Sequence, residues 1–323
     1  MAGTSTTGVA NEPAVAAAAA ADASAKKPPR RPRLNKETLA GYLFIAPGVI
    51  HSLLFIVFVL FVSAFLSLTR WDLVSSPEFI GIQNYVDLFS DELFFITIKN
   101  TVIFVLMFIP LTITLSLSVA LAANTKLRGL AFFRTAYFFP YVASMVAVAI
   151  VFRWLFSSDY GLINGFLGWF GIDPVNWLNS CSTALPSIAF VSVWKGLGWN
   201  MTLFLAGLQG IPSHLYEAAA LDGAGRWRQF RDITWPLLTP TTFFVLVTSV
   251  LGSFQVFDTA YLMTQGGPER CTYTYLYYLY QQGFRFFNMG YAAAMAWLLF
   301  AVLIAVTFIQ FKFLNKRVNY ELG

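Results

Sequence analysis

Two strongly apolar stretches of the chain carry polar side chains of the kinds that bind small hydroxylated molecules. The segment VWKGLGWN contributes Trp194, Lys195, Gly196, Trp199 and Asn200, and the segment GSFQVFDTAY contributes Ser253, Phe254, Gln255, Phe257 and Asp258. Aromatic faces can stack on the apolar patches of a sugar ring, while amides and carboxylates hydrogen-bond to its hydroxyl groups. Ionisable side chains inside a membrane are costly and usually mark a functional site. Both segments are therefore candidates for solute contact.

A purely structural role is the alternative for these residues. Lys195 and Asp258 could pair with each other, or with a partner chain, to satisfy buried charge. Trp194 and Trp199 could pack inside a helix bundle. Lys195 could also favour an anionic solute such as a phosphodiester.

Nothing in the chain has the pattern of a catalytic or metal site. His51 and His214 are its only histidines, and Cys181 and Cys271 lack the spacing of metal-binding or redox motifs. The phosphate-binding pattern G-x-x-x-x-G-K followed by Ser or Thr is also absent, so any ATP must be bound by another chain. We expect no enzyme, no metal and no cofactor in this chain.

The composition is that of a membrane protein. The 323 residues are 57% hydrophobic and 11% charged, with a mean hydropathy of +0.64. A soluble core of this size could not bury so much apolar surface. The net charge of +5 reflects basic residues that favour membrane topology over nucleic-acid binding.

Six windows are long and apolar enough to span a bilayer, which predicts an all-α integral membrane fold. They lie near 40–68, 98–123, 132–156, 184–208, 237–263 and 290–313. Residues 1–36 are rich in alanine and proline and then basic, so we expect a disordered tail that is not a cleaved signal peptide. Residues 37–323 form the predicted transmembrane domain.

Basic residues predict the orientation of the six spans. Fifteen of the 21 lysines and arginines flank one set of helix ends: Lys26, Lys27, Arg30, Arg31, Arg33, Lys36, Lys126, Arg128, Arg134, Arg226, Arg228, Arg231, Lys312, Lys316 and Arg317. This bias places both termini in the cytoplasm. Longer segments near 70–96, 157–183 and 264–289 then lie on the opposite, oxidising face. Cys181 and Cys271 fall there, and either a disulfide or two free thiols fits the sequence.

A charged segment, EAAALDGAGRWRQFRDITWP, interrupts the apolar second half of the chain. It belongs to a predicted cytoplasmic loop over 211–236. We expect Ser213 to cap a short Ala-rich helix that ends at Gly223 in a left-handed conformation. A second helical stretch should follow, with Pro236 opening the next span. Such a helix can insert into a groove on another protein, and an amphipathic segment without a partner is the alternative.

This loop resembles the EAA loop of the membrane subunits of binding-protein-dependent ABC importers. The matching residues are Glu217, Ala218, Ala219, Asp222, Gly223, Ala224, Phe230, Ile233, Pro236, Leu237 and Pro240. Trp235 departs from the family, which usually has leucine there, and this affects local packing only. The resemblance extends over about 38–320 through GIQNYVDLF, GLQGIP and FDTAYLMTQGGP, and it favours the carbohydrate branch of maltose-type and glycerol-phosphate-type importers.

The resemblance implies the six-helix bundle of a type I importer permease, of the MetI-like kind. It implies that residues 213–224 couple the chain to a cytoplasmic ATPase, with Glu217, Ala218, Ala219, Asp222, Gly223 and Ala224 at the joint. It places Gly196, Trp199, Phe254, Gln255 and Asp258 near positions that line the solute site of maltose-type permeases. Lys195 and Asn200 complete the predicted pathway residues.

The implied partners are a second homologous permease, two ATPases that bind ATP and magnesium, and an extracytoplasmic solute-binding protein. The implied location is the bacterial inner membrane, among lipid and without nucleic acid, and the solute is a sugar, an oligosaccharide or a glycerol-phosphate-type compound. An ion-gradient-driven secondary transporter is the alternative, although residues 40–156 and 184–313 show no internal repeat of the kind such proteins commonly carry. A membrane-embedded enzyme is disfavoured because no convergent set of His, Asp, Glu and Cys occurs at membrane depth.

Overall fold

The computed structural model describes residues 36–125 and 129–314 and divides them into two units that meet between Phe61 and Val62. The predicted tail therefore lies outside the described residues, except for Lys36, which begins the first helix. Nine of the 15 basic residues used for orientation are also outside them: Lys26, Lys27, Arg30, Arg31, Arg33, Lys126, Arg128, Lys316 and Arg317.

The first unit is one helical segment. It comprises α2 (Lys36–Ser52), a π-helical turn η1 (Leu53–Val57) and the start of α3 (Phe58–Leu66). Residues Leu39–Leu66 are long and apolar enough to cross a membrane. Their apolar side chains are almost all exposed, which suits a helix that faces lipid or another chain.

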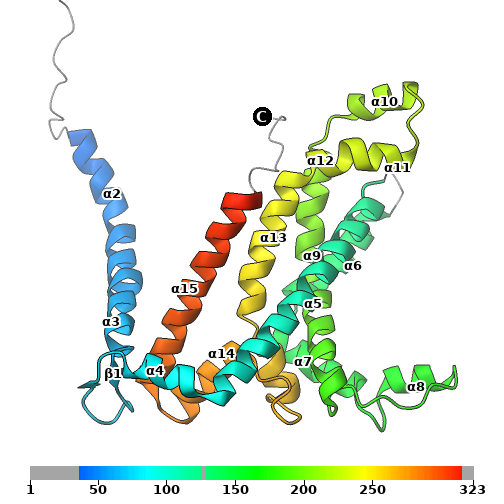
Figure 1. Ribbon diagram of the computed structural model, residues 1–323. Coiled ribbons are helices and arrows are strands. Elements are labelled where there is room, and N and C mark those ends of the chain that lie inside the picture. The colour runs from blue at the N-terminus through cyan, green and yellow to red at the C-terminus, as the bar shows by residue number, and fades with distance from the viewer. Residues whose placement is uncertain (1–35, 126–128, 315–323) are drawn as a thin grey trace, which may run out of the picture. The chain divides into compact units, whose positions relative to one another are not determined.

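The second unit is a bundle of helices (Figure 1). It opens with a short hairpin, β1 (Thr69–Arg70) and β2 (Glu78–Phe79), and continues through α4 (Gln83–Ser90), α5 (Glu92–Ala123), α6 (Leu130–Val142), α7 (Met145–Leu155), α8 (Leu162–Gly168) and α9 (Cys181–Gln209). The remaining elements are α10 (Ser213–Leu221), α11 (Arg226–Gln229), η2 (Phe230–Thr234), α12 (Trp235–Leu237), α13 (Thr239–Phe254), η3 (Ala260–Thr264), α14 (Tyr275–Tyr280), η4 (Gln281–Arg285) and α15 (Met289–Leu314).

Four of the six predicted spans are continuous helices, and the other two are broken. The third consists of α6 and α7, which meet at an angle of 98°, and the fifth follows α11–α12 with a bend of 63° at Leu238. The fifth span is also interrupted, because α13 stops at Phe254 and helix resumes only at Asp258, two residues before η3. Continuous helices over 132–156 and 237–263 were therefore wrong expectations, since apolar composition predicts a span but not its breaks.

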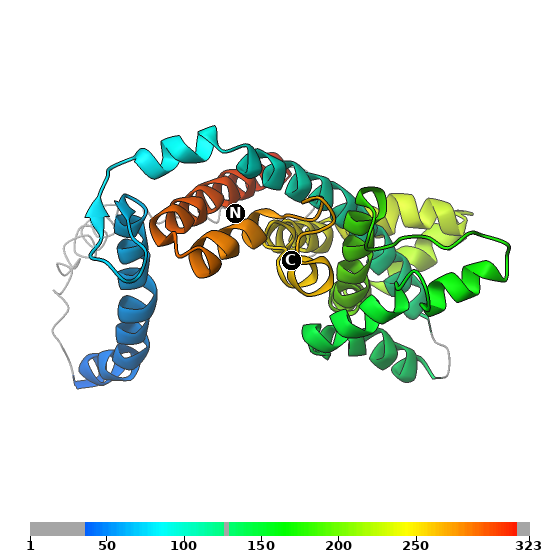
Figure 2. The same cartoon turned by 90° about the horizontal axis from the view of Figure 1, so that it is seen from below.

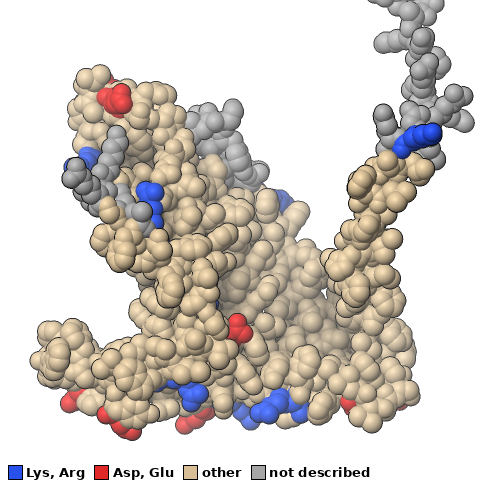
Figure 3. Space-filling model, turned by 180° about the vertical axis from the view of Figure 1, so that it is seen from behind, with Lys and Arg blue, Asp and Glu red and all other residues tan. Residues whose placement is uncertain are grey.

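The two ends of this unit differ in structure. We call the end that carries α10–α12 the loop end, and the end that carries β1–β2, α4, α8 and α14 the hairpin end (Figure 1). The three long segments that were predicted to share one side all lie at the hairpin end. On the face seen in Figure 3, most charged side chains of this unit lie near its two ends, with little charge between them, as expected for a bilayer-spanning body.

Helix α9 is central to the bundle and packs against α5, α6 and α13 (Figure 2). Two of the three buried apolar clusters are built on it, one near the hairpin end with α5, α7 and η3, and one near the loop end with α5 and α13. Gly198 allows α6 to approach closely, because a Cβ atom there would lie 2.2 Å from the carbonyl oxygen of Tyr137.

Candidate functional site

A cavity of about 270 Å³ opens where both broken spans are interrupted. Its walls come from α5, the junction of α6 and α7, the middle of α9, and the stretch between α13 and η3. The lining residues are Phe104, Phe108, Tyr141, Met145, Ser192, Lys195, Gly196, Gly252, Ser253, Gln255, Val256, Phe257, Asp258 and Thr259. Irregular backbone at membrane depth occurs where it is buried in protein or lines a cavity, and both breaks obey this rule.

The structure brings together four of the seven predicted pathway residues, since Lys195, Gly196, Gln255 and Asp258 all line this cavity. Trp199 does not line it but stacks on Tyr141, which does, with ring centroids 5.3 Å apart. Asn200 is buried behind Gly196, and Phe254 packs with the cluster of α4, α14 and α15. These placements do not test solute contact, which stays a prediction.

The interruption after α13 exposes polar groups beside aromatic rings. Gln255 ends the helix, and both Gln255 and Asp258 are exposed to the cavity. Within residues 36–125 and 129–314, neither side chain forms a hydrogen bond or an ion pair. Phe257 stacks on Tyr261 at 5.3 Å and contacts Tyr280 at 5.0 Å, so its ring is held in place. The arrangement offers one amide, one carboxylate and an aromatic surface to a polar ligand.

Sequence reasoning missed the wall contributed by the broken third span. Tyr141 and Met145 line the cavity only because the chain turns between them. Pro140 was the available signal, since a proline inside a predicted span often precedes a kink or a helix end.

The side chain of Lys195 forms its hydrogen bonds with backbone carbonyl groups and not with Asp258. Its Nζ atom donates hydrogen bonds to the carbonyl oxygens of Ala143 at 2.7 Å, Tyr141 at 3.1 Å and Pro140 at 3.3 Å. The ion pairs of the described residues are Arg70–Glu78, Arg228–Asp232 and Arg231–Asp232. No direct ion pair therefore joins Lys195 and Asp258 among the described residues, although the two charges still act on each other.

The charged segment at the loop end folds as two helical pieces. Helix α10 ends in a Schellman motif, because Gly223 has a φ of +76°, its amide donates to Ala220, and the amide of Ala224 donates to Ala219. The left-handed conformation expected at Gly223 is thus present. The expected cap at Ser213 was wrong, because Pro212 occupies the cap position and Ser213 is already helical.

The second piece runs through α11, η2 and α12 without interruption over 226–237. Pro236 lies inside it, so the expectation that Pro236 opens the next span was also wrong. Helix α13 begins at Thr239, with Pro240 in its first turn, where the missing amide hydrogen costs nothing.

The two pieces are fixed to each other and to the bundle. The hydroxyl groups of Tyr216 and Thr234 lie 2.9 Å apart, and Leu215, Phe230 and Ile233 pack against the core near the loop end. The opposite surface is free: Glu217, Ala218, Asp222 and Gly223 are exposed, and Leu221 is 91% exposed. The predicted coupling residues therefore share one solvent-facing surface of α10 and its end, which we call the ledge, with Ala219 and Ala224 half-buried at its base.

Comparison with known proteins identifies the family. Residues 101–320 match the family described as binding-protein-dependent transport system inner membrane component. The chain belongs to this family. It is 40% identical over 293 residues to the probable ABC transporter permease protein YesP of Bacillus subtilis, covering 89% of this chain and 94% of that one. It is 34% identical over 283 residues to the sulfoquinovosyl glycerol transport system permease protein SmoG of Agrobacterium fabrum, covering 87% and 92%.

A solved structure shares the fold. It is a bacterial alginate ABC transporter in complex with an alginate pentasaccharide-bound periplasmic protein, and it matches with a TM-score of 0.77 at 24% identity, covering 85% of this chain and 93% of that one. The chain is thus a membrane-embedded permease subunit of an ATP-driven importer. The ion-gradient-driven alternative is not favoured.

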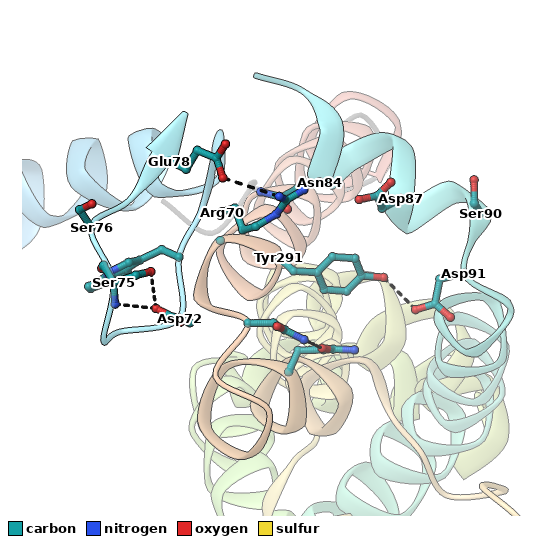
Figure 4. Close-up of a pocket in the computed structure, with 14 residues that line it drawn as sticks. Arg70, Asp72, Ser75, Ser76, Glu78, Asn84, Asp87, Ser90, Asp91 and Tyr291 are labelled. Atoms are coloured by element: carbon teal, nitrogen blue, oxygen red, sulfur yellow. Dashed lines mark hydrogen bonds and ion pairs between the residues drawn. The ribbon is translucent and has the colours of Figure 1, made fainter. Parts of the chain in front are cut away.

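The hairpin end of this permease carries a pocket of about 940 Å³, which sequence reasoning did not predict. Arg70 and Glu78 form an exposed ion pair at its rim, and Asp91 accepts a hydrogen bond from Tyr291 (Figure 4). Burial acts to raise the pKa of Asp91, but hydrogen bonds from Tyr278, Tyr291 and the backbone outweigh it and lower the pKa below its usual value. Burial and the Asp91 carboxylate together raise the pKa of Tyr278 to about 12.

Cys181 and Cys271 are joined by a disulfide at this end of the molecule. Their Cα atoms are 5.4 Å apart, a usual separation for a disulfide. The bond ties the start of α9 to the segment between η3 and α14.

Proposed function

We propose that the permease carries a sugar, an oligosaccharide or a glycerol-phosphate-type solute through the cavity between α6–α7, α9 and the α13–η3 interruption. The observation that supports this is the pair of unpaired polar groups, Gln255 and Asp258, beside the aromatic ring of Phe257. An amide, a carboxylate and a fixed ring are suited to the hydroxyl groups and apolar faces of a sugar. The relative SmoG, named for sulfoquinovosyl glycerol transport, supports the same solute class.

Import in this proposal is driven through the ledge at the loop end. Helix α10 docks into a groove on a cytoplasmic ATPase, with Glu217, Asp222, Gly223 and the exposed Leu221 at the contact. Two ATPases bind ATP and magnesium, and this chain binds no cofactor. Because α10 is tied to η2 and to the core of α5 and α9, movement of the ATPase is transmitted to the bundle as movement of one body.

The remaining partners follow from the same proposal. Six spans form half of a pore, so a second homologous permease supplies the other half, and an extracytoplasmic binding protein delivers the solute to the hairpin end. The loop end and both termini lie in the cytoplasm of a bacterium, and the bundle lies in the inner membrane. The excess of basic residues at that set of helix ends supports this orientation.

The test uses the complete importer, purified through a tag on this chain and reconstituted in liposomes with its binding protein. Uptake is measured for neutral sugars, oligosaccharides, glycerol phosphate, amino acids and peptides, for wild type, Asp258→Asn and Gln255→Ala. Loss of a hydrogen bond to a charged group costs about 1.5–3 kcal/mol, so Asp258→Asn should weaken apparent solute affinity about 10- to 100-fold. Asp173→Asn, an exposed carboxylate between α8 and α9, is the matched control.

Two results would overturn the proposal. One is uptake of amino acids or peptides in place of carbohydrate-type solutes. The other is wild-type uptake by both cavity variants, which would place the solute path elsewhere.

A further inference from the structure

The break between α6 and α7 leaves a helix end at membrane depth. Ala143 and Ser144 are extended, with ψ angles of 144° and 131°, so α6 stops at Val142 and the chain turns by 98°. The last carbonyl groups of a helix have no amide partners within it. In a bilayer they must be satisfied by protein or by water in a cavity, because no lipid tail can donate a hydrogen bond.

Lys195 supplies those hydrogen bonds. It lies midway along the 29 residues of α9, roughly 20 Å from either end, which is too far for its side chain to reach water at the membrane surface. Its ammonium group has three N–H donors, and the three carbonyl groups of Pro140, Tyr141 and Ala143 accept them. A positive charge is also favoured next to the negative end of a helix dipole.

Trp199, one turn further along α9, contacts the same end of α6. It shares a helix face with Lys195, four residues away, and its ring stacks on Tyr141 with an interplanar angle of 19°. Helix α9 therefore makes two contacts with Tyr141: Lys195 donates a hydrogen bond to the backbone carbonyl of Tyr141, and Trp199 stacks on the ring of Tyr141. Tyr141 and Met145, on either side of the break, are the cavity wall that this arrangement sets in place.

We propose that Lys195 is a positioning residue: its ammonium group caps the end of α6 and holds the bend between α6 and α7, so that Tyr141 and Met145 form the cavity wall. All three of its donors are used by backbone, so it is not the group that recognises solute charge. That the cavity carries solute rests on the proposed function, whereas the capping of α6 does not.

The experiment measures the bend without any solute. The complete importer in nanodiscs is followed by amide hydrogen exchange over 139–148, for wild type, Lys195→Met, Lys195→Gln and Lys195→Arg. Lys99→Met is the matched control, because Lys99 also lies in a spanning helix and its side chain makes no hydrogen bond or ion pair within the described residues. Loss of the cap should speed exchange in this segment by about 10- to 100-fold in Lys195→Met. Lys195→Gln should show a smaller effect, Lys195→Arg should restore protection, and Lys99→Met should match wild type.

A second measurement separates this role from solute recognition. In the uptake assay, Lys195→Met should raise the half-saturating concentrations of a neutral sugar and of glycerol phosphate by the same factor. Lys195→Arg should restore both values. Wild-type exchange over 139–148 in Lys195→Met would overturn the proposal, as would an uptake defect confined to the anionic solute. Failure of the proposed function is seen separately, as wild-type uptake by the Asp258 and Gln255 variants.

Discussion

The close approach of α6 to α9 at Gly198 offers a direct test of how the cavity wall is held. At Gly198 of α9, an added Cβ atom would lie 2.2 Å from the carbonyl oxygen of Tyr137, 2.6 Å from the Cα atom of Phe138 and 2.9 Å from the carbonyl carbon of Tyr137. All three atoms belong to the backbone of α6, so no side chain can rotate away. Gly198→Ala must therefore push α6 away from α9.

The size of the effect follows from these distances. Restoring a normal contact requires roughly 1 Å of separation between two close-packed helices, and overpacking of this kind costs about 1–3 kcal/mol. If the Lys195 side chain did not move with α6, such a shift would lengthen its hydrogen bonds, now 2.7–3.3 Å long, past the limit for a hydrogen bond. Gly196 is the internal control, because a Cβ atom there meets only Asn200 Nδ2, at 3.9 Å.

Replacing a glycine inside a helix by alanine normally gains about 1 kcal/mol, and Gly196→Ala should show that gain. Gly198 also lies inside α9 and has the same gain, so the two variants should differ by the overpacking cost alone, about 1–3 kcal/mol or about 2–10 °C in Tm, measured by thermal unfolding of the purified importer in detergent. Equal Tm values for the two variants, or a more stable Gly198→Ala, would refute the close approach of α6 and α9.

Three further predictions concern other parts of the chain. Maleimide should label the wild-type protein only after reduction, and labelling before reduction would show that the two thiols are free. Replacing one partner of the disulfide, in Cys181→Ser, should lower the stability by about 2–4 kcal/mol. The pKa of Asp91 is lower in the folded than in the unfolded protein, so the ionised carboxylate stabilises the folded state at pH values above the unfolded pKa of about 3.9. The difference in Tm between wild type and Asp91→Asn should therefore be constant from pH 7 to pH 5. It should shrink as the pH falls below about 4. Leu221→Ser should reduce the amount of ATPase that co-purifies with a tagged permease, without lowering the Tm of the permease. An unchanged amount of ATPase would show that α10 is not part of the contact.

The sequence predicted the spans well because apolar length is a strong signal, and it predicted their continuity poorly. Residues 132–156 are apolar throughout, so composition alone favours one helix, and only Pro140 hints at the turn between Ala143 and Ser144. That turn depends on a contact with α9, more than 50 residues further along the chain. Local propensity carries no information about such a partner.

The loop could be predicted in more detail because its determinants are local. A glycine after an Ala-rich helix favours the left-handed ending that Gly223 adopts. The errors at Ser213 and Pro236 are displacements of a helix boundary, and in both places a neighbouring proline, Pro212 or Pro240, takes the position expected of another residue. Helix ends are the least predictable part of a helix for this reason.

Lys195 and Asp258 show why residue type alone could not assign roles in the cavity. Both are ionisable, both lie in apolar segments and both line the same space, so the sequence treats them alike. The structure separates them, because every donor of Lys195 is used by the backbone of α6, while Asp258 has no hydrogen-bond partner among the described residues. A charge that is fully satisfied by the fold stabilises a wall, and a polar group left unsatisfied there favours any ligand that can pair with it. Recognition by this permease should therefore depend on the α13–η3 side of the cavity, and the shape of the cavity on the α6–α9 side.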